Sequence, residues 1–221
     1  MLFRSYSAPN ATKVTVNGEL DGKAHDLVKD ANGLWSVTVG PLAPDIYTYT
    51  FNVDGVVALD PRNYNTKYGN GGFPSATVVQ VPGDGPQFYD VKDVPHGEVR
   101  ILPYVSKTLG GLARTAWIYT PPGYDKGKNY PVLYLLHGAG DIESGWTMIG
   151  RANNILDNLI AAGKATPMVV VMPAGHTRRG AAAQGATGRT ATDEFVQDFV
   201  GDVMPYIEKN YRVETEIGRA H

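Results

Sequence analysis

The 221-residue chain contains no cysteine. Disulfide bonds, cysteine-ligated zinc and a thiol nucleophile are therefore excluded. Long hydrophobic runs are also absent: none approaches the ~18 residues of a membrane-spanning helix, and the longest, Val132–Leu136, has the length of a strand. Neither sign of charge dominates, because 20 Lys and Arg stand against 22 Asp and Glu. This balance argues against a basic surface for nucleic acid.

Short runs that alternate apolar and polar residues dominate residues 1–92. The expected strands are Lys13–Val16, Leu34–Val39, Ile46–Val53, Val56–Leu59 and Ala76–Val81. Asn17-Gly18 and Asp54-Gly55 end two of these runs with typical turn dipeptides. Regularly spaced short strands predict an all-β immunoglobulin-like sandwich over residues 1–92. The Pro- and Gly-rich stretch 81–87 is typical of a linker.

The pattern changes in residues 93–221, where strands alternate with helices. Val99–Val105 and Ala113–Thr120 are expected to form an antiparallel pair, and Val132–Leu136 and Met168–Met172 are apolar on both faces, as buried parallel strands are. A helical stripe around Leu156 lies between the latter two. Apolar residues recurring every four positions predict a second helix over 192–211, kinked or broken at Pro205. This order predicts an α/β domain.

A glycine-rich segment, His137-Gly138-Ala139-Gly140, directly follows the strand expected at Val132–Leu136. Glycines at a strand end free backbone N–H groups to face a developing negative charge, which is one half of the oxyanion hole of an α/β-hydrolase. The same glycines suit a tight turn that requires positive φ. Both interpretations stay open on the sequence. A phosphate-binding loop is not indicated, because neither of the usual glycine motifs occurs.

Several successive segments resemble one enzyme family. Trp117–Tyr124, Tyr130–Gly138, Asp141–Trp146, Val171–Thr177 and Asp198–Val213 are similar, in this order, to bacterial esterases of the feruloyl and acetyl-xylan type. These belong to the first carbohydrate esterase family and the enterochelin-esterase-like group. The resemblance covers about residues 96–221. It implies an α/β-hydrolase domain, a serine carboxylesterase activity on small or polysaccharide-linked esters, no cofactor or metal, and a secreted or periplasmic location.

The first 92 residues resemble the early-set, carbohydrate-binding-module-like sandwich that often precedes such esterases. The likeness rests on Ala8–Ala11, Gly33–Trp35, Tyr47–Gly55 and Asp60–Asn63. The loop Asn17–His25 lacks the Trp that sugar-binding relatives use for stacking. A structural role for this module is therefore expected, with Trp35 as a core aromatic residue.

Besides the missing Trp, the chain departs from the family in its catalytic residues. Members place the nucleophile in a G-x-S-x-G elbow shortly after the segment that matches Tyr211–Val213, and their acid and histidine follow further on. Here the serines after residue 92 are Ser106 and Ser144, and neither has the elbow spacing. The expected fold is thus a sandwich over 1–92 and a truncated α/β-hydrolase domain over 93–221 that lacks the Ser-His-Asp triad.

The resemblance assigns roles to the residues that remain. Gly138, Ala139 and Gly140 would supply the oxyanion hole, and His137, Trp146 and His176 would line the substrate pocket, with His137 also ordering its loop. Ser144 is a weak candidate nucleophile. Arg178-Arg179 is expected to be a solvated pair, and His221 a mobile terminal residue.

Two further expectations follow. The chain alone should be inactive or very weak as an esterase, and the alternative is a non-catalytic glycan-binding or interaction protein. In the α/β-hydrolase strand order, Val132–Leu136 lies beside the elbow strand, so one edge of it would be unpaired. That edge carries no charge or proline and predicts self-association into a homo-oligomer.

Overall fold

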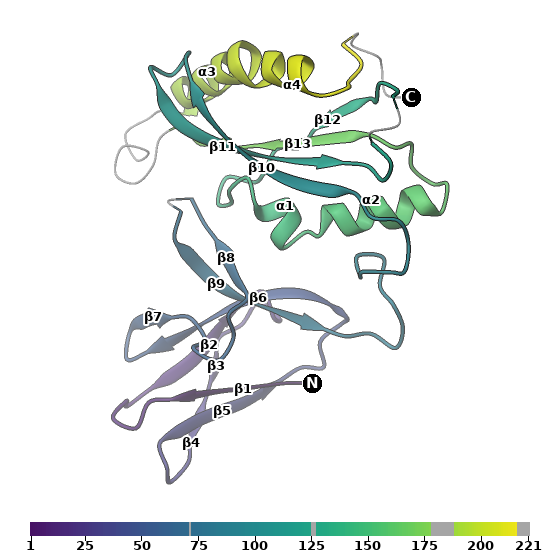
Figure 1. The fold of residues 1–221 in the computed structure, drawn as a ribbon. Helices are drawn as coiled ribbons and strands as arrows, with labels where there is room; N and C mark the ends of the chain where they lie inside the picture. Colours follow the sequence, from purple (N-terminus) through teal and green to yellow (C-terminus); the bar gives the residue numbers. More distant parts are fainter. Residues whose placement is uncertain (71, 125–126, 178–187, 216–221) are drawn as a thin grey trace. The chain divides into compact units, whose positions relative to one another are not determined.

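The computed structural model describes residues 1–70, 72–124, 127–177 and 188–215 (Figure 1). Arg178, Arg179 and His221 lie outside these residues. The chain divides into two compact units, Met1–Gly69 with Phe73–Gln87, and Asn70–Gly72 with Phe88–His221.

The first unit consists of two antiparallel sheets. One has the order β1-β5-β4, with bounds Leu2–Ser7, Leu34–Val39 and Val28–Lys29. The other has the order β3-β2-β6-β9-β8, with β7 also paired to β6; the bounds are His25–Asp26, Val14–Gly18, Asp45–Val53, Pro74–Val81, Thr66–Tyr68 and Val56–Ala58. The alternation therefore located the main strands, whereas β1, β3, β4 and β8 carried no clear signal.

One apolar core lies between residues of both sheets. It contains Val14 and Phe51 from one sheet and Val39 from the other, all almost fully buried. Trp35 is buried beside them, and its indole N–H donates to the Ala8 carbonyl oxygen at 2.9 Å. Because its ring is enclosed, Trp35 does not offer a face to a sugar.

The second unit is built on a four-stranded sheet with the order β10-β11-β13-β12. The bounds are Glu98–Ser106, Leu112–Thr120, Val169–Pro173 and Val132–Tyr134. Neighbours β10, β11 and β13 are antiparallel, whereas β12 and β13 are parallel. The hairpin between β10 and β11 turns at Gly110 and Gly111, both of which have positive φ.

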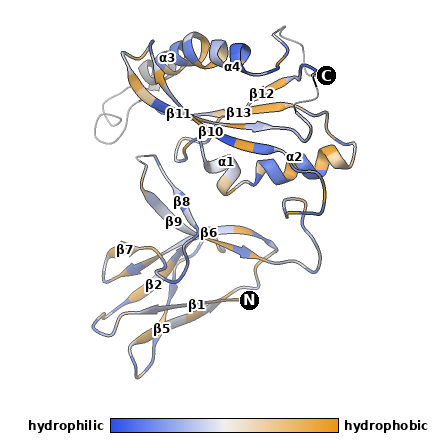
Figure 2. Cartoon of the chain, viewed as in Figure 1, coloured by the Kyte–Doolittle hydropathy of each residue, from blue (hydrophilic) through white to orange (hydrophobic). Residues whose placement is uncertain are grey.

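Helices cover both faces of this sheet (Figure 1). On one face lie α1 (Gly145–Met148) and α2 (Ala152–Ala161), and on the other α3 (Gly188–Asp198) and α4 (Met204–Asn210). Strand β13 is buried on both sides: Val169 and Val171 pack with Ile207, and Val170 and Met172 with Leu156. Figure 2 shows the apolar colouring of this central strand against mixed colouring on the helices.

The last helical segment differs from the single helix expected over 192–211. It begins at Gly188, passes through a π-helical turn at Phe199–Val203, and continues as α4 with Pro205 in its first turn. The Met204 N–H donates to the Phe199 carbonyl oxygen five residues back, so the π-helical turn leads directly into α4, in which Pro205 follows. The chain therefore breaks its regular helix just before Pro205.

Strand β12 is shorter and more exposed than the apolar run predicted. It ends at Tyr134, and Leu133 and Leu136 are 44% and 48% exposed. Tyr130 forms a parallel bridge with Val213. Since Pro131 accepts from Val169 on the β13 side and backbone groups alternate along a strand, Val213 lies beyond the other edge of β12. Past this bridge, the described residues place no strand against that edge.

The boundary between the units also differs from the predicted one between residues 92 and 93. The units divide after Gln87 because helix α2 holds the following segment. Asn158 donates its amide to the carbonyl oxygens of Phe88 and Asp90 at 2.9 Å each, and Arg151 pairs with the Asp90 carboxylate at 3.5 Å. No described helix is long and apolar enough to cross a membrane.

Candidate active site

The candidate site lies where β12 and β13 end. Because the two strands are parallel, their carboxyl ends meet at the same edge of the sheet, which is where ligands bind in open α/β sheets. Two loops leave from this edge: Leu135–Ser144 after β12, and Ala174–Thr177 after β13. They carry the residues that the sequence singled out.

The loop after β12 presents three backbone N–H groups to solvent. Gly138, Ala139 and Gly140 are all exposed, and within the described structure none of their N–H groups donates to a protein acceptor. The loop turns by a bond from the Asp141 N–H to the Gly138 carbonyl oxygen at 3.0 Å. Three adjacent, unused donors are what an anionic oxygen would require.

The conformation of the glycines and the space around them bear on the two sequence interpretations. Neither Gly138 nor Gly140 has a positive φ, so the turn does not demand glycine on conformational grounds. A Cβ on Gly140 would meet no atom within 4 Å, and one on Gly138 would meet only the Asp141 carboxylate at 3.2 Å. The protein's own packing therefore leaves room above this backbone.

His137 connects the two loops. Its Nδ1 lies 2.8 Å from the Gly138 carbonyl oxygen, and its Nε2 accepts the Gly175 N–H at 2.8 Å. The two bonds fix the tautomer, since Nε2 accepts and Nδ1 must then donate. Both ring nitrogens are occupied, so His137 orders the loops and has no nitrogen left for acid–base chemistry.

His176 lies beside His137, with ring centroids 4.9 Å apart. Its Nε2 donates to the Asp141 carbonyl oxygen at 2.9 Å, which joins the β13 loop to the glycine loop a second time. Burial lowers the pKa of His176, an effect that the hydrogen bond to Asp141 opposes and the neighbouring His137 reinforces. His176 is therefore held as a neutral donor near neutral pH.

Trp146 and Ser144 flank the same loop. The Trp146 indole N–H donates to the Leu136 carbonyl oxygen at 2.9 Å, and the side chain is 38% exposed. Ser144 is 9% exposed and precedes helix α1. Among the described contacts, no hydrogen bond joins the Ser144 hydroxyl to an imidazole, which a serine nucleophile needs.

A residue that sequence reasoning missed holds this arrangement in place. Arg114, on β11, is 4% exposed, and its guanidinium donates to the carbonyl oxygens of Ala174 and His176, the latter at 2.8 Å. It also pairs with the Asp198 carboxylate at 2.9 Å. The available signal was its place in the strand, two residues before Ala116 and hence on the same buried face.

The described cavities and charges set limits on the site. Neither of the two cavities outlined by described residues is lined by His137, Trp146 or His176. In the part of the chain that the structure describes, no three His, Asp or Glu side chains gather to hold a metal ion. The pocket role expected for the three residues stays a prediction.

The chain is similar to known esterases. A family model described as "Putative esterase" matches residues 106–220, more than half of the chain. The chain belongs to the Esterase family. An "Endo-1,4-beta-xylanase/feruloyl esterase" from Xylanibacter ruminicola is 36% identical over 217 residues, 95% of this chain and 29% of that protein.

Two other likenesses are informative about this Esterase-family chain. The ferulic acid esterase of Anaeromyces mucronatus, solved with ferulic acid, is 27% identical with a TM-score of 0.50, covering 62% of this chain and 52% of that one. The enterobactin esterase of Shigella flexneri shares the fold, with a TM-score of 0.65 at 15% identity over 96% of this chain and 60% of that one. The chain thus spans under a third of its curated relative and about half of the solved ferulic acid esterase.

Replacing Arg114 should loosen both the sheet and the loop. Arg114→Met leaves the buried Asp198 carboxylate without its cation, and breaking a buried pair in this way costs about 3–5 kcal/mol. We expect this loss in urea unfolding of the second unit, with faster amide exchange at Gly175. The control is Lys107→Met, an exposed cation on the same hairpin, which should change neither. Equal stability of the two variants would contradict the assignment.

The lowered pKa of His176 predicts a dependence on pH. Its proton binds more tightly to the unfolded chain than to the folded one, so its contribution is present above about pH 6.5 and is lost on acidification. An NMR titration should place the His176 midpoint below 6.5. His176→Gln keeps a donor for the Asp141 carbonyl and should flatten the acid limb of the stability curve. A midpoint at or above 6.5 would refute this.

Proposed function

We propose that this chain supplies the oxyanion side of the active site of a serine carboxylic-ester hydrolase acting on feruloyl or acetyl esters of plant polysaccharide. The observation that supports it most directly is the open backbone of Gly138–Gly140, with three unused N–H donors at the carboxyl end of β12. Such donors stabilise the oxyanion that forms when an ester carbonyl is attacked. The similarity to feruloyl and ferulic acid esterases suggests the acyl group, and such substrates imply export from the cell.

The 221 residues by themselves are proposed to be inactive or very weak. Ser144 lacks both the elbow spacing and a hydrogen bond to an imidazole, and both nitrogens of His137 are occupied. An oxyanion site and substrate binding without a triad leave roughly 10³-fold catalysis over water. The chain would therefore contribute electrostatic stabilisation and a cleft wall, but no nucleophile.

Two measurements test this proposal. Methyl ferulate should shift the amide NMR signals of Gly138, Ala139 and Gly140, while those of Gly110 and Gly111 in the β10–β11 turn should stay unchanged. Unmoved signals in the glycine loop would argue against an ester site there.

The second measurement is turnover of p-nitrophenyl acetate by the wild type and Ser144→Ala. We expect the same low rate from both, and no labelling by a fluorophosphonate probe. Stoichiometric labelling that disappears in Ser144→Ala would show that the chain carries its own nucleophile.

Self-association through β12 is a further part of the proposal. The backbone groups of Val132 and Tyr134 point away from β13, and Leu133 is 44% exposed. An edge of this kind without charges favours pairing with a second copy. Sedimentation equilibrium should give a mass above that of the monomer, and Leu133→Lys should shift it toward the monomer. Leu159→Lys, on helix α2, is the matched control. A monomeric wild type would refute the association.

A further inference from the structure

A cavity lies in the same unit, at the end of the sheet opposite to the glycine loop. It has a volume of about 250 Å³ and is lined by His96, Gly97, Glu98, Thr120, Pro121, Gly123 and Tyr124. Strands β10 and β11 place it there: Glu98 begins β10 and pairs with Thr120, which ends β11. The carboxyl end of β13 pairs with β11 at Ala116, so the candidate active site lies toward the other end of β11.

A buried carboxylate, Asp157, is hydrogen-bonded to two of the residues that line this cavity. Asp157, on helix α2, is 2% exposed and accepts three hydrogen bonds. Its Oδ1 accepts the Tyr119 hydroxyl at 2.7 Å and the Gly97 N–H at 2.9 Å, and its Oδ2 lies 2.9 Å from Nδ1 of His96. Burial, followed by this hydrogen bond to Asp157, raises the pKa of Tyr119. Tyr119 therefore stays protonated and donates.

The carboxylate sets the tautomer of His96. Asp157 accepts the hydrogen bonds from Tyr119 and Gly97. Nδ1 of His96 therefore carries the proton of the hydrogen bond between His96 and Asp157. In the neutral imidazole, Nε2 then holds a lone pair, on the side of the ring away from Asp157. The side chain of His96 is 43% exposed and lines the cavity, and no described contact uses Nε2. Asp157 thereby fixes the orientation of the His96 ring and leaves Nε2 as an acceptor that faces the cavity side.

The local sequence is built to bring His96 to this position. A Cβ on Gly97 would overlap the Thr120 carbonyl oxygen and the ring of Tyr119. Only glycine therefore lets the chain pass close enough for its N–H, and the preceding imidazole, to reach Asp157. The following Glu98 is exposed and lines the same cavity.

The described lining of the cavity offers hydrogen-bond acceptors and some apolar surface, but no Lys or Arg. Nε2 of His96 and the Glu98 carboxylate can accept hydrogen bonds, Thr120 can donate or accept, and the partly exposed Tyr124 adds apolar area. Among the described lining residues there is no Lys or Arg to pair with an anion such as a phosphate or a free carboxylate. Its volume lies below the 300–1,000 Å³ that is typical of drug-sized ligands. The ligand must be small, neutral and rich in hydroxyl donors.

We propose that this cavity binds a single sugar ring, whose hydroxyl groups donate to Nε2 of His96 and to the Glu98 carboxylate. Asp157 is a positioning residue for His96 and does not touch the ligand. The site is separate from the glycine loop and does not depend on ester hydrolysis by this chain. It would hold a sugar unit at one end of the sheet while the other end faces an ester.

The experiment uses the full chain and follows the amide NMR signals of Gly97, Thr120 and Gly123 during titration with D-xylose. A saturable shift in the millimolar range is expected. Sodium acetate and methylammonium chloride probe for an anion or a cation site, and neither should shift these signals. A flat response to xylose, or a response to acetate or methylammonium alone, overturns the proposal.

Two variants separate binding from a merely structural role of the histidine. His96→Asn places its side-chain amide where Nδ1 lies and so keeps the bond to Asp157, but it removes Nε2. Glu98→Gln removes the carboxylate, and Glu208→Gln, an exposed residue of α4, is its control. We expect unchanged unfolding for all three, about tenfold weaker xylose binding for the first two and wild-type binding for the third. Wild-type affinity in folded His96→Asn would overturn the assignment.

Discussion

The buried ion pair between Arg114 and Asp198 is the constraint on which the second unit depends. Neither side chain reaches solvent: Arg114 is 4% exposed and Asp198 is fully buried. Asp198 also accepts the Tyr104 hydroxyl at 2.8 Å, and its other oxygen has no hydrogen-bond partner among the described residues. A buried pair is tolerated only when the remaining donors are satisfied. Arg114 meets this requirement with backbone carbonyls, and in doing so it fixes the loop after β13.

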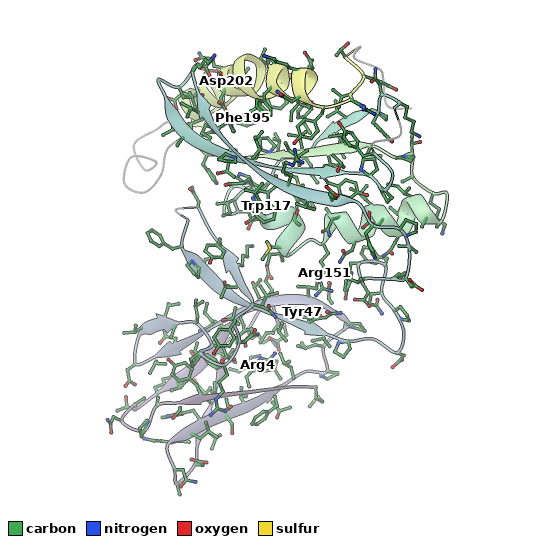
Figure 3. The ribbon with its side chains drawn as sticks, in the orientation of Figure 1. Arg4, Tyr47, Trp117, Arg151, Phe195 and Asp202 are labelled. Atoms are coloured by element: carbon green, nitrogen blue, oxygen red, sulfur yellow. The ribbon has the colours of Figure 1, made fainter. Side chains whose placement is uncertain are left out.

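That choice of acceptors connects stability to the site. A guanidinium is planar and presents its donors in a fixed fork, so the carbonyls of Ala174 and His176 must stay where the fork reaches them. Gly175 lies between these two carbonyls in the chain, and its N–H donates to Nε2 of His137. His137 in turn holds the Gly138 carbonyl and so the glycine loop. The position of the exposed N–H groups of the glycine loop is thus set by the buried Arg114, through the loop after β13 and His137. Figure 3 shows how densely side chains fill the layer between the sheet and its helices.

A second buried, hydrogen-bonded carboxylate lies at the opposite end of the sheet, on the other face. There the buried carboxylate is Asp157 on α2, and it again accepts a tyrosine hydroxyl from a neighbouring strand. At the first end the carboxylate meets an arginine whose three nitrogens each bond to a protein group. At the second it meets a histidine with one nitrogen left over. The difference between a purely structural centre and the proposed binding centre lies in that remaining nitrogen.

The sequence predicted what depends on local pattern and missed what depends on tertiary partners. Alternation located β5, β6 and β9, and the apolar run located β13, because burial on one or both faces leaves a direct trace in residue type. Arg114, Asp157 and Asp198 show only that a charge interrupts an apolar pattern. Arg114 and Asp198 lie 84 positions apart in the chain, and Asp157 lies 38 positions from Tyr119, and no spacing rule pairs them. The length of β12 was mispredicted for the same reason. Its apolar residues predict a buried strand, but the described residues place no neighbouring strand against its outer edge.

The glycine loop is a case in which the sequence leaves two interpretations open and the geometry bears on both. Gly138-Ala139-Gly140 fits a turn and an oxyanion loop equally well as a string of letters. The two readings differ in what would happen to an added Cβ: a turn of the positive-φ type would be strained by it, and a site would be blocked by it. Here φ is not positive, and the space above Gly140 is open to 4 Å. Nothing within the described protein requires glycine at position 140, and the unused N–H groups leave this backbone free to donate to an acceptor, which is what the proposed ester site needs.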